Sequence, residues 1–189
     1  MRFSFILLAG GNSDRFKSNL PKPYHKIGGK TLIEICLNKI KKFKEFKKII
    51  IVINEKHKKY LKKIKLKKVV IINGGQTRQK STFNALNYFK KNNNADTVLI
   101  HDVARPNFSL NLVKKIIATS KKYRVVVPRL KLQDALKRKN NKNTFINLNR
   151  DNFFLTQTPQ SFNFKRIYNL HKKNKNEYSG DDLSLIHSN

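Results

Sequence analysis

Short apolar runs alternate with amphipathic helical patterns along this chain. Apolar residues recur at helical spacing in Leu32, Cys36 and Ile40, and Thr31 and Glu34 form a capping box before them. Runs rich in β-branched or aromatic residues have the length of buried strands and lie at 5–8, 49–53, 69–72, 97–100 and 125–127. Strands that alternate with helices predict an α/β fold with a parallel sheet covered on both faces.

The pattern weakens from Arg129 to Arg150, where the segment is polar and charged except for a strand-like stretch at 144–148. Such an excursion is either a mobile loop or an arm that pairs with a second subunit. A last basic helix is expected from Phe164 to Leu170. We expect one domain over residues 1–189, with a dimerisation arm at 129–150.

The charge of the chain is strongly positive, with 42 basic and 11 acidic residues and a formal net charge of +31. Such a balance suggests nucleic acid, a membrane surface or an anionic substrate as partner. Only nine of the 42 basic residues are arginine, which leads in base and phosphate recognition, and the lysines are spread along the chain. We therefore expect a solvated basic surface that attracts anionic substrates, and no nucleic-acid partner.

The single cysteine, Cys36, excludes an internal disulfide, and its apolar helical surroundings indicate a packing role. No apolar run has the length needed to span a bilayer. The apolar run at the N-terminus is too short for the core of a signal peptide and leads directly into a glycine corner. We expect a cytoplasmic protein without a membrane partner.

Candidate chemistry lies at the ends of three predicted strands. In open parallel sheets, ligands bind beyond the carboxyl ends of the strands, so these ends should converge on one crevice. A glycine corner lets backbone amides approach an anion, and cations just beyond it suit a polyphosphate. The residues at these ends are Ala9, Gly10, Gly11, Arg15 and Lys22 after the first strand, Gly75, Gln76 and Ser81 after the third, and Asp102 and Arg105 after the fourth.

Each of these motifs also has a purely structural interpretation. The first corner fits an ordinary basic surface loop, and its spacing is neither that of a P-loop nor that of a dinucleotide fingerprint. Asp102 can cap a helix, form a salt bridge or hold Mg²⁺. The polyphosphate loop nearby favours Mg²⁺, which takes one or two carboxylates together with substrate phosphates. Arg105 can bind a phosphate or pair with Asp102, and His101 is expected to be packed and not to act as a base.

No Ser-His-Asp or Cys-His arrangement and no zinc-like spacing is present in the sequence. An enzyme with this inventory works by positioning and charge neutralisation, which is how phosphoryl and nucleotidyl transfer proceed.

The chain resembles the 2-C-methyl-D-erythritol 4-phosphate cytidylyltransferase family over nearly its whole length. The matching segments are, in order, LLAGGNSDRFKSNLPKPY, GGQTRQKSTFNAL, IHDVARP, LQDALKR, NRDNFFLTQTPQSF and SGDDLSL. The resemblance implies a Rossmann-like three-layer nucleotidyltransferase fold, with a mostly parallel sheet, helices on both faces and a protruding β-arm. It also implies cytidylyl transfer from CTP to methylerythritol phosphate, with Mg²⁺ and in a homodimer, in non-mevalonate isoprenoid biosynthesis.

Roles for the candidate residues follow from the same resemblance. Arg15 and Lys22 would neutralise the CTP phosphates and the transition state. Asp102 would lie beside Mg²⁺ and both substrates, Arg105 would hold methylerythritol phosphate, and Arg150 would reach that substrate across a dimer interface. The residues that would line or recognise the nucleotide are Ala9, Gly10, Gly11, Gly75, Gln76 and Ser81.

Two departures from the family pattern leave alternatives open. Ala135 stands where the family usually has threonine, and the chain stops at Asn189, before a strand that carries an acid and a lysine in the family. We expect either a fragment or a shortened protein with impaired or altered catalysis. The alternatives are a cytidylyltransferase for ribitol 5-phosphate or a related polyol phosphate, and a non-catalytic homologue or basic nucleic-acid-binding protein that retains the fold.

Overall fold

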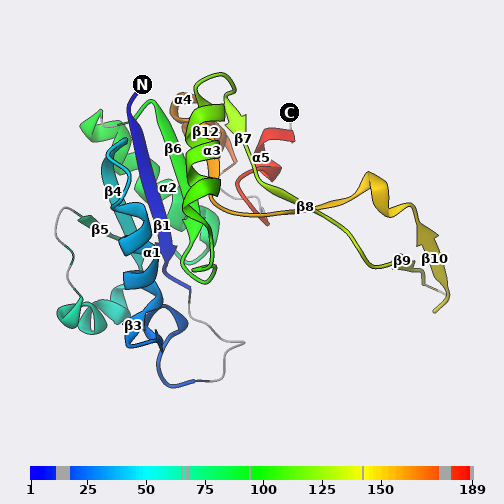
Figure 1. Ribbon diagram of the computed structural model, residues 1–189, viewed down its shortest axis with the longest axis horizontal. Helices are drawn as coiled ribbons and strands as arrows, with labels where there is room; N and C mark the ends of the chain where they lie inside the picture. Colours follow the sequence, from blue (N-terminus) through cyan, green and yellow to red (C-terminus); the bar gives the residue numbers. More distant parts are fainter. Residues whose placement is uncertain are drawn as a thin grey trace.

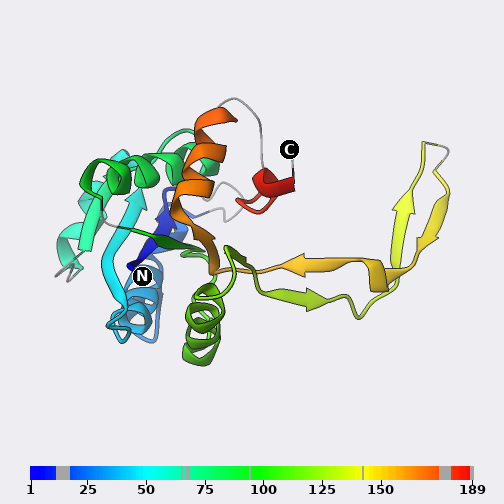
Figure 2. The ribbon, with the colours of Figure 1, turned by 90° about the horizontal axis from the view of Figure 1, so that it is seen from above.

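The computed structural model forms three layers, with helices on both faces of one central sheet and a narrow arm that projects to one side (Figures 1 and 2). The α/β fold expected from the sequence is therefore confirmed. Among the described residues, no helix has the length and apolar character needed to cross a membrane. The structure describes residues 1–11, 18–64, 66, 69–93, 95–141, 143–174 and 180–187.

The central sheet has the strand order β5-β4-β1-β6-β12-β7. The strands are β1 (Phe3–Ala9), β4 (Phe46–Ile53), β5 (Val69–Asn73), β6 (Thr97–Asp102), β7 (Val125–Val126) and β12 (Gln160–Asn163). Strands β5, β4, β1 and β6 are parallel, whereas β12 runs antiparallel to β6 and to β7. The sheet is thus mostly parallel, as expected.

Two strands differ from the pattern that the sequence suggests. Apolar periodicity does not predict β12, because buried Gln160 and Ser161 occupy core positions, and Ser161 Oγ accepts a hydrogen bond from Ser120 Oγ at 2.8 Å. Strand β5 was expected to be fully buried, but it is the edge of the sheet, and Ile71 is exposed there.

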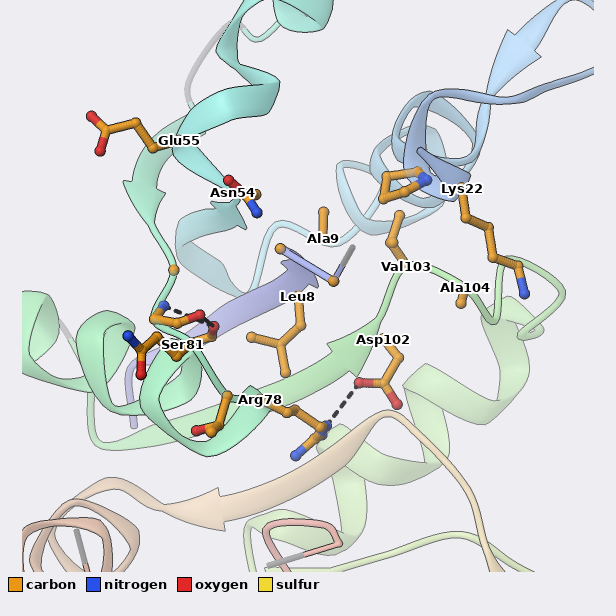
Figure 3. A pocket seen from close by; sticks show the side chains of 17 residues that line it. Leu8, Ala9, Lys22, Asn54, Glu55, Arg78, Ser81, Asp102, Val103 and Ala104 are labelled. Atoms are coloured by element: carbon orange, nitrogen blue, oxygen red, sulfur yellow. Dashed lines mark hydrogen bonds and ion pairs between the residues drawn. The ribbon is translucent and has the colours of Figure 1, made fainter. Parts of the chain in front are cut away.

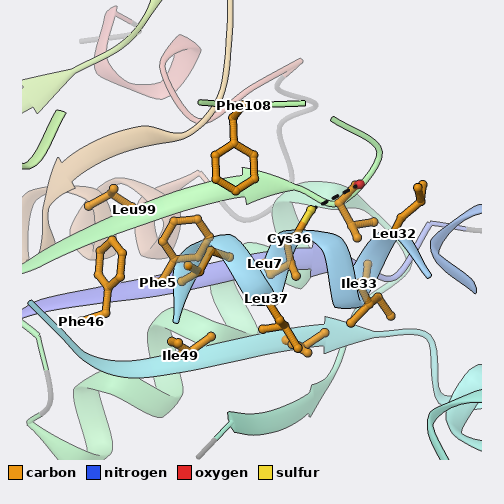
Figure 4. Packing of buried hydrophobic residues seen from close by; sticks show 14 of the residues in the cluster. Phe5, Leu7, Leu32, Ile33, Cys36, Leu37, Phe46, Ile49, Leu99 and Phe108 are labelled. Carbon is orange, nitrogen blue, oxygen red and sulfur yellow. Dashed lines mark hydrogen bonds between the residues drawn. The ribbon is translucent and has the colours of Figure 1, made fainter. Parts of the chain in front are cut away.

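Every residue of β1 is buried, because successive side chains enter two different cores. Phe5 and Leu7 pack against α1 (Leu32–Ile40) and α3 (Leu110–Ser120) on one face (Figure 4). Ile6 and Leu8 face the opposite core, which contains residues of α2 (Arg78–Asn92) and α4 (Phe164–Lys173).

Helix α1 begins and packs as its sequence predicts. Thr31 Oγ1 accepts the Glu34 amide, and the Glu34 carboxylate accepts the Thr31 amide at 2.8 Å, which completes the capping box. Cys36 is completely buried in the first core, and burial raises the pKa of its thiol to about 12. The packing role expected for this cysteine is confirmed.

The arm consists of two antiparallel ribbons in succession that extend away from the three layers (Figure 2). Its elements are β8 (Arg129–Lys131), β9 (Leu136–Lys139), β10 (Phe145–Leu148), the 3₁₀ helix η4 (Arg150–Asn152) and β11 (Phe154–Thr156). Since β8 pairs with β11, the projecting segment returns to the sheet only after Thr156 and is longer than the expected 129–150.

Candidate active site

A cavity of about 650 Å³ lies at the carboxyl ends of β1, β5 and β6 (Figure 3). We call it the first cavity. The residues that line it come from segments far apart in the sequence: 8–11, Lys22, Pro23, Asn54, Glu55, 74–78, Ser81 and 102–104. The ends of three strands whose chemistry was singled out in the sequence therefore meet at one site.

The glycine corner of the first cavity continues β1. Ala9 is buried at the end of the strand, and Gly10 and Gly11 follow it along the cavity wall. Arg15 lies outside the described residues, so its role in phosphate binding stays a prediction.

Lys22 lines the first cavity and belongs to the 3₁₀ helix η2 (Lys22–Tyr24). A small hairpin of β2 (Lys26–Ile27) and β3 (Lys30–Thr31) follows this helix. Tyr24 anchors this helix, because its ring is buried and packs 5.0 Å from the ring of Tyr60 and 5.7 Å from that of His57. Burial raises the pKa of Tyr24 to about 12. Lys22 thus extends from a backbone segment that apolar packing holds in place.

Gly75 and Ser81 shape the opposite wall together. Ser81 Oγ accepts a hydrogen bond from the Gly75 amide at 3.0 Å, so this hydroxyl folds the segment as well as lining the cavity. A Cβ atom on Gly75 would lie 2.1 Å from Cγ and 2.6 Å from Cβ of Lys80, so any other residue would displace the first turn of α2. Gln76, between this glycine and the helix, also lines the cavity and is exposed.

Asp102 ends β6 and forms ion pairs with two arginines. Its Oδ1 accepts a hydrogen bond from Arg78 Nε at 3.1 Å, and its Oδ2 lies 3.7 Å from Arg105 Nε. Arg105 also donates from Nη1 to Gln157 Oε1 at 2.7 Å. The salt-bridge interpretation of Asp102 and its pairing with Arg105 are therefore confirmed. Among the described residues, Oδ2 accepts no hydrogen bond.

The donor set of the first cavity fits a hard divalent cation that is bound mainly by substrate phosphates. Mg²⁺ takes one or two carboxylates and completes its shell with phosphate oxygens and water, and Asp102 offers one such carboxylate. The described residues contain no group of three or more His, Cys, Asp and Glu side chains that could hold a metal without a substrate. Glu55 also lines the cavity, but its carboxylate bonds with Lys58 and Asn73.

A second cavity, of about 740 Å³, shares a wall with the first. Arg78 and Asp102 line both cavities, so their side chains form the partition between them. Arg105 belongs to the second cavity only, and the remaining residues there are Phe154, Thr156, Thr158, Gln160, Gly180, Asp181, Leu183 and Ser184. Two neighbouring spaces that meet at one carboxylate are suited to two substrates.

Arg150 lines neither of these two cavities. It lies in η4 on the arm, where its Nη1 donates to the carbonyl oxygen of Gln133. Within one chain Arg150 is therefore outside both cavities, and its predicted contact across a dimer interface stays a prediction.

His101 precedes Asp102 but faces the protein interior. It is completely buried, its Nε2 lies 3.1 Å from the carbonyl oxygen of Arg105, and its Nδ1 lies 2.8 Å from Thr158 Oγ1. Because a carbonyl can only accept, Nε2 carries the proton and Nδ1 accepts from the threonine. Burial lowers the pKa of His101 to about 4, so the expected packing role, and not that of a base, is confirmed.

Arg78, His171 and Asp182 hold the partition in place, and none of them is among the site residues predicted from the sequence. Arg78 Nη1 donates to Asp182 Oδ2 at 2.7 Å, and His171 Nε2 lies 3.0 Å from Asp182 Oδ1. Burial would raise the pKa of Asp182, but the Arg78 guanidinium and the His171 hydrogen bond outweigh it and hold the pKa below its ordinary value. One feature of the sequence could have indicated these acids. Arg78 lies in the first turn of a helix, where the helix dipole disfavours a cation unless acids lie nearby.

Comparisons with known proteins agree with the geometry. The family model described as 2-C-methyl-D-erythritol 4-phosphate cytidylyltransferase matches residues 3–189. A "Bifunctional enzyme IspD/IspF" of Pelagibacter ubique is 46% identical over 186 residues, which are 98% of this chain and 49% of that protein. A 2-C-methyl-D-erythritol 4-phosphate cytidylyltransferase of Thermosipho melanesiensis is 36% identical over 189 residues, covering 96% of this chain and 82% of the relative.

Solved structures give the same result. A 4-diphosphocytidyl-2C-methyl-D-erythritol synthase from Anaerococcus prevotii superposes with a TM-score of 0.82 at 30% identity, over 97% of this chain and 80% of that one. The bifunctional IspDF of Campylobacter jejuni superposes with a TM-score of 0.83 at 30% identity, over 98% of this chain and 47% of that one. The chain thus spans about half the length of the bifunctional relatives that it matches.

The matching family consists of nucleotidyltransferases, as expected from the sequence, and none of the relatives named above has a name that points to ribitol 5-phosphate. The chain belongs to the 2-C-methyl-D-erythritol 4-phosphate cytidylyltransferase family.

Proposed function

We propose that this chain transfers a cytidylyl group from CTP to 2-C-methyl-D-erythritol 4-phosphate at the partition between the two cavities. The observation that carries the proposal is that Asp102 and Arg78 line both cavities, with Lys22 in the first and Arg105 in the second. A nucleotide and a phosphorylated acceptor in these spaces would meet at one carboxylate. Family membership supports this assignment.

In this mechanism the first cavity takes CTP, with its triphosphate along the glycine corner and its base toward Gly75 and Gln76. A phosphate oxygen of methylerythritol phosphate attacks the α-phosphorus in line, and a new phosphorus–oxygen bond forms. The bond from the α-phosphorus to the oxygen that bridges to the β-phosphorus breaks, and pyrophosphate leaves with that electron pair.

The residues contribute positioning and charge neutralisation. The Lys22 ammonium stabilises the charge that develops on the α-phosphoryl oxygens, and Arg15 is proposed to do the same. Arg105 orients the phosphate of the acceptor. Asp102 is proposed to hold Mg²⁺, which when bound neutralises charge on the triphosphate.

The test is pyrophosphate release by the chain with CTP and Mg²⁺. We expect release with methylerythritol phosphate and much slower release with ribitol 5-phosphate. Equal rates with both polyol phosphates would contradict the proposed substrate, and no release with either would contradict the proposed reaction. Salt-sensitive binding to duplex DNA without any release would favour the non-catalytic alternative.

We also propose that the chain acts as a homodimer through the arm. Large apolar side chains on the arm are between 42% and 65% exposed, and a face of this kind is costly to leave in water. These residues are Leu130, Phe145, Ile146, Phe153, Phe154 and Leu155. Arg150 lies among them, so pairing of two arms would let it approach the second cavity of the other subunit.

Analytical ultracentrifugation tests the dimer. We expect a dimer for the parent chain and a shift toward monomer for Phe145→Glu, with Tyr123→Glu as a matched exposed aromatic position outside the arm. A strictly monomeric parent would contradict a role for Arg150 across an interface. The cytoplasmic location expected from the sequence stays a prediction.

A further inference from the structure

Arg78 occupies an unfavourable position for a cation, and the structure resolves this with two acids. It is the first residue of α2, where the helix dipole is positive, and its side chain is only 27% exposed. One guanidinium therefore bridges two carboxylates, with Nε on Asp102 at 3.1 Å and Nη1 on Asp182 at 2.7 Å. Burial works to lower the pKa of Arg78, but both acids raise it, so the cation stays charged.

Asp182 is fixed from its other side. It is 1% exposed in its side chain, and His171 of α4, which is also buried, lies 3.0 Å from its second oxygen. The His171 ring stacks on Phe83 of α2 with an interplanar angle of 4°. Asp182 is thereby held between two helices, and its hydrogen bond to Arg78 fixes the position of the guanidinium.

The neighbouring acid, Asp181, fastens the same segment by different bonds. Its oxygens accept hydrogen bonds from Thr156 Oγ1 at 3.1 Å, from Gln160 Nε2 at 2.9 Å and from the Ser184 amide at 3.0 Å. These donors come from β11, from β12 and from the short helix α5 (Ser184–His187). The segment that carries Asp182 is therefore attached to the sheet independently of Arg78.

We propose that Arg78 is a positioning residue, which Asp182 holds so that its guanidinium fixes the Asp102 carboxylate between the two cavities. Arg78 holds Oδ1 of Asp102 by a hydrogen bond. Among the described residues, Oδ2 makes only the longer ion pair with Arg105 at 3.7 Å, and it is the oxygen that we propose for the ligands that meet there. Its planar fork reaches both acids at once, which the single ammonium of a lysine cannot do with the same geometry. The kinetic consequence of this inference rests on the proposed function.

A purely structural role gives a different expectation. If Arg78 served only to neutralise the partly exposed Asp102 and the buried Asp182, lysine would retain most of that effect, and folded Arg78→Lys would turn over normally. If the fork orients Asp102, lysine restores the charge without restoring the turnover. Arg2 offers a matched control, since it forms an ion pair with Asp96 at 2.7 Å on the surface, away from both cavities.

The experiment compares Arg78→Lys with Arg2→Lys in the full chain. We expect Arg78→Lys to lower kcat by about 10- to 100-fold, the usual loss when the partner of a functional ligand is changed, with KM for CTP within about twofold of the parent. Mn²⁺ binding to the chain with CTP, followed by electron paramagnetic resonance, should weaken by a similar factor. Arg2→Lys should match the parent in each measurement.

Normal kcat and Mn²⁺ affinity in folded Arg78→Lys would overturn the proposal. If the parent releases no pyrophosphate, the proposed function fails, and the Mn²⁺ titration alone decides the inference. If circular dichroism shows Arg78→Lys unfolded, Asp182→Asn is measured in its place, with the same expected loss. If neither variant folds, Arg78 is a folding determinant and the proposal is wrong.

Discussion

The outer part of the first cavity and the partition between the cavities are held in place by different forces. The corner at Gly10 follows the buried strand β1, the corner at Gly75 follows the edge strand β5, and Tyr24 fastens the segment of Lys22 through apolar packing. The partition consists of charged side chains, with Arg78 between Asp102 and Asp182. Apolar packing thus stabilises one wall and ion pairs stabilise the other, so substitutions and pH should affect the two walls differently.

The largest effect on stability is expected where the ion pairs are buried. Asp182→Asn leaves the Arg78 cation with one acid fewer and should lower the free energy of unfolding by about 3–5 kcal/mol. Asp96→Asn, which breaks a surface pair, should cost at most about 1 kcal/mol. Urea denaturation measures both, and equal losses would show that the partition does not depend on buried charge.

The same pair predicts a pH dependence. The pKa of Asp182 is held below its ordinary value in the folded chain, so the unfolded chain binds a proton first as the pH falls. The contribution of the pair is thus present above the ordinary aspartate pKa and lost below it. Asp182→Asn should show a weaker loss of stability in acid than the parent.

The largest effect on turnover without loss of stability is expected when a cationic side chain proposed to bind the triphosphate is removed. Lys22→Ala and Arg15→Ala should each lower kcat by about 100- to 1,000-fold, the loss found when a donor to a transition-state oxyanion is removed. Lys26→Ala, an exposed lysine of the adjacent hairpin, serves as the control. Steady-state kinetics measures kcat, and a thermal melt shows that each variant is folded. Near-normal turnover of the folded variants would refute the role in triphosphate binding.

Arg105→Ala should distinguish the substrate of the second cavity from that of the first. Loss of a charged hydrogen-bond donor to the acceptor phosphate should raise KM for methylerythritol phosphate by about 10- to 100-fold and leave KM for CTP nearly unchanged. The two KM values measured on one variant check this. A change in KM for CTP alone would show that Arg105 binds CTP and not methylerythritol phosphate.

Gly75→Ala tests the backbone wall of the first cavity. The added Cβ would overlap Lys80, and relief of such overlap costs about 1–3 kcal/mol of stability. Gly11→Ala is the matched control, because a Cβ there meets nothing within 4 Å. Chemical denaturation of both variants should place Gly75→Ala well below Gly11→Ala, and the reverse order would exclude this steric requirement.

The smallest effect is expected at Tyr24. Its hydroxyl is buried without a hydrogen-bond partner among the described residues, so Tyr24→Phe should be nearly neutral at neutral pH. Because the folded pKa is raised to about 12, the unfolded chain loses this proton first, and the parent loses stability above about pH 10. The difference between the two unfolding free energies across that range checks the prediction, and a constant difference would contradict it.

Five of the six strands of the central sheet, and the strand ends that line the first cavity, were predictable because local sequence determines them. Runs such as Ile49–Ile53 fix strands by themselves, and the glycine corners follow directly from where two of those strands end. Strand β12 was not predictable, since Gln160 is buried through hydrogen bonding to Asp181, a residue distant in the sequence. The Arg78–Asp182 pair joins residues 104 positions apart, and no local pattern indicates such a contact.

Asp102 provides the most direct test of the claim that two substrates meet at the partition. The measurement is single-turnover formation of cytidine diphosphate methylerythritol from CTP, Mg²⁺ and methylerythritol phosphate by the parent and by Asp102→Asn. We expect product and pyrophosphate in equal amounts for the parent, and a rate at least about 100-fold lower for the variant. A variant that forms product at the parent's rate would contradict the claim.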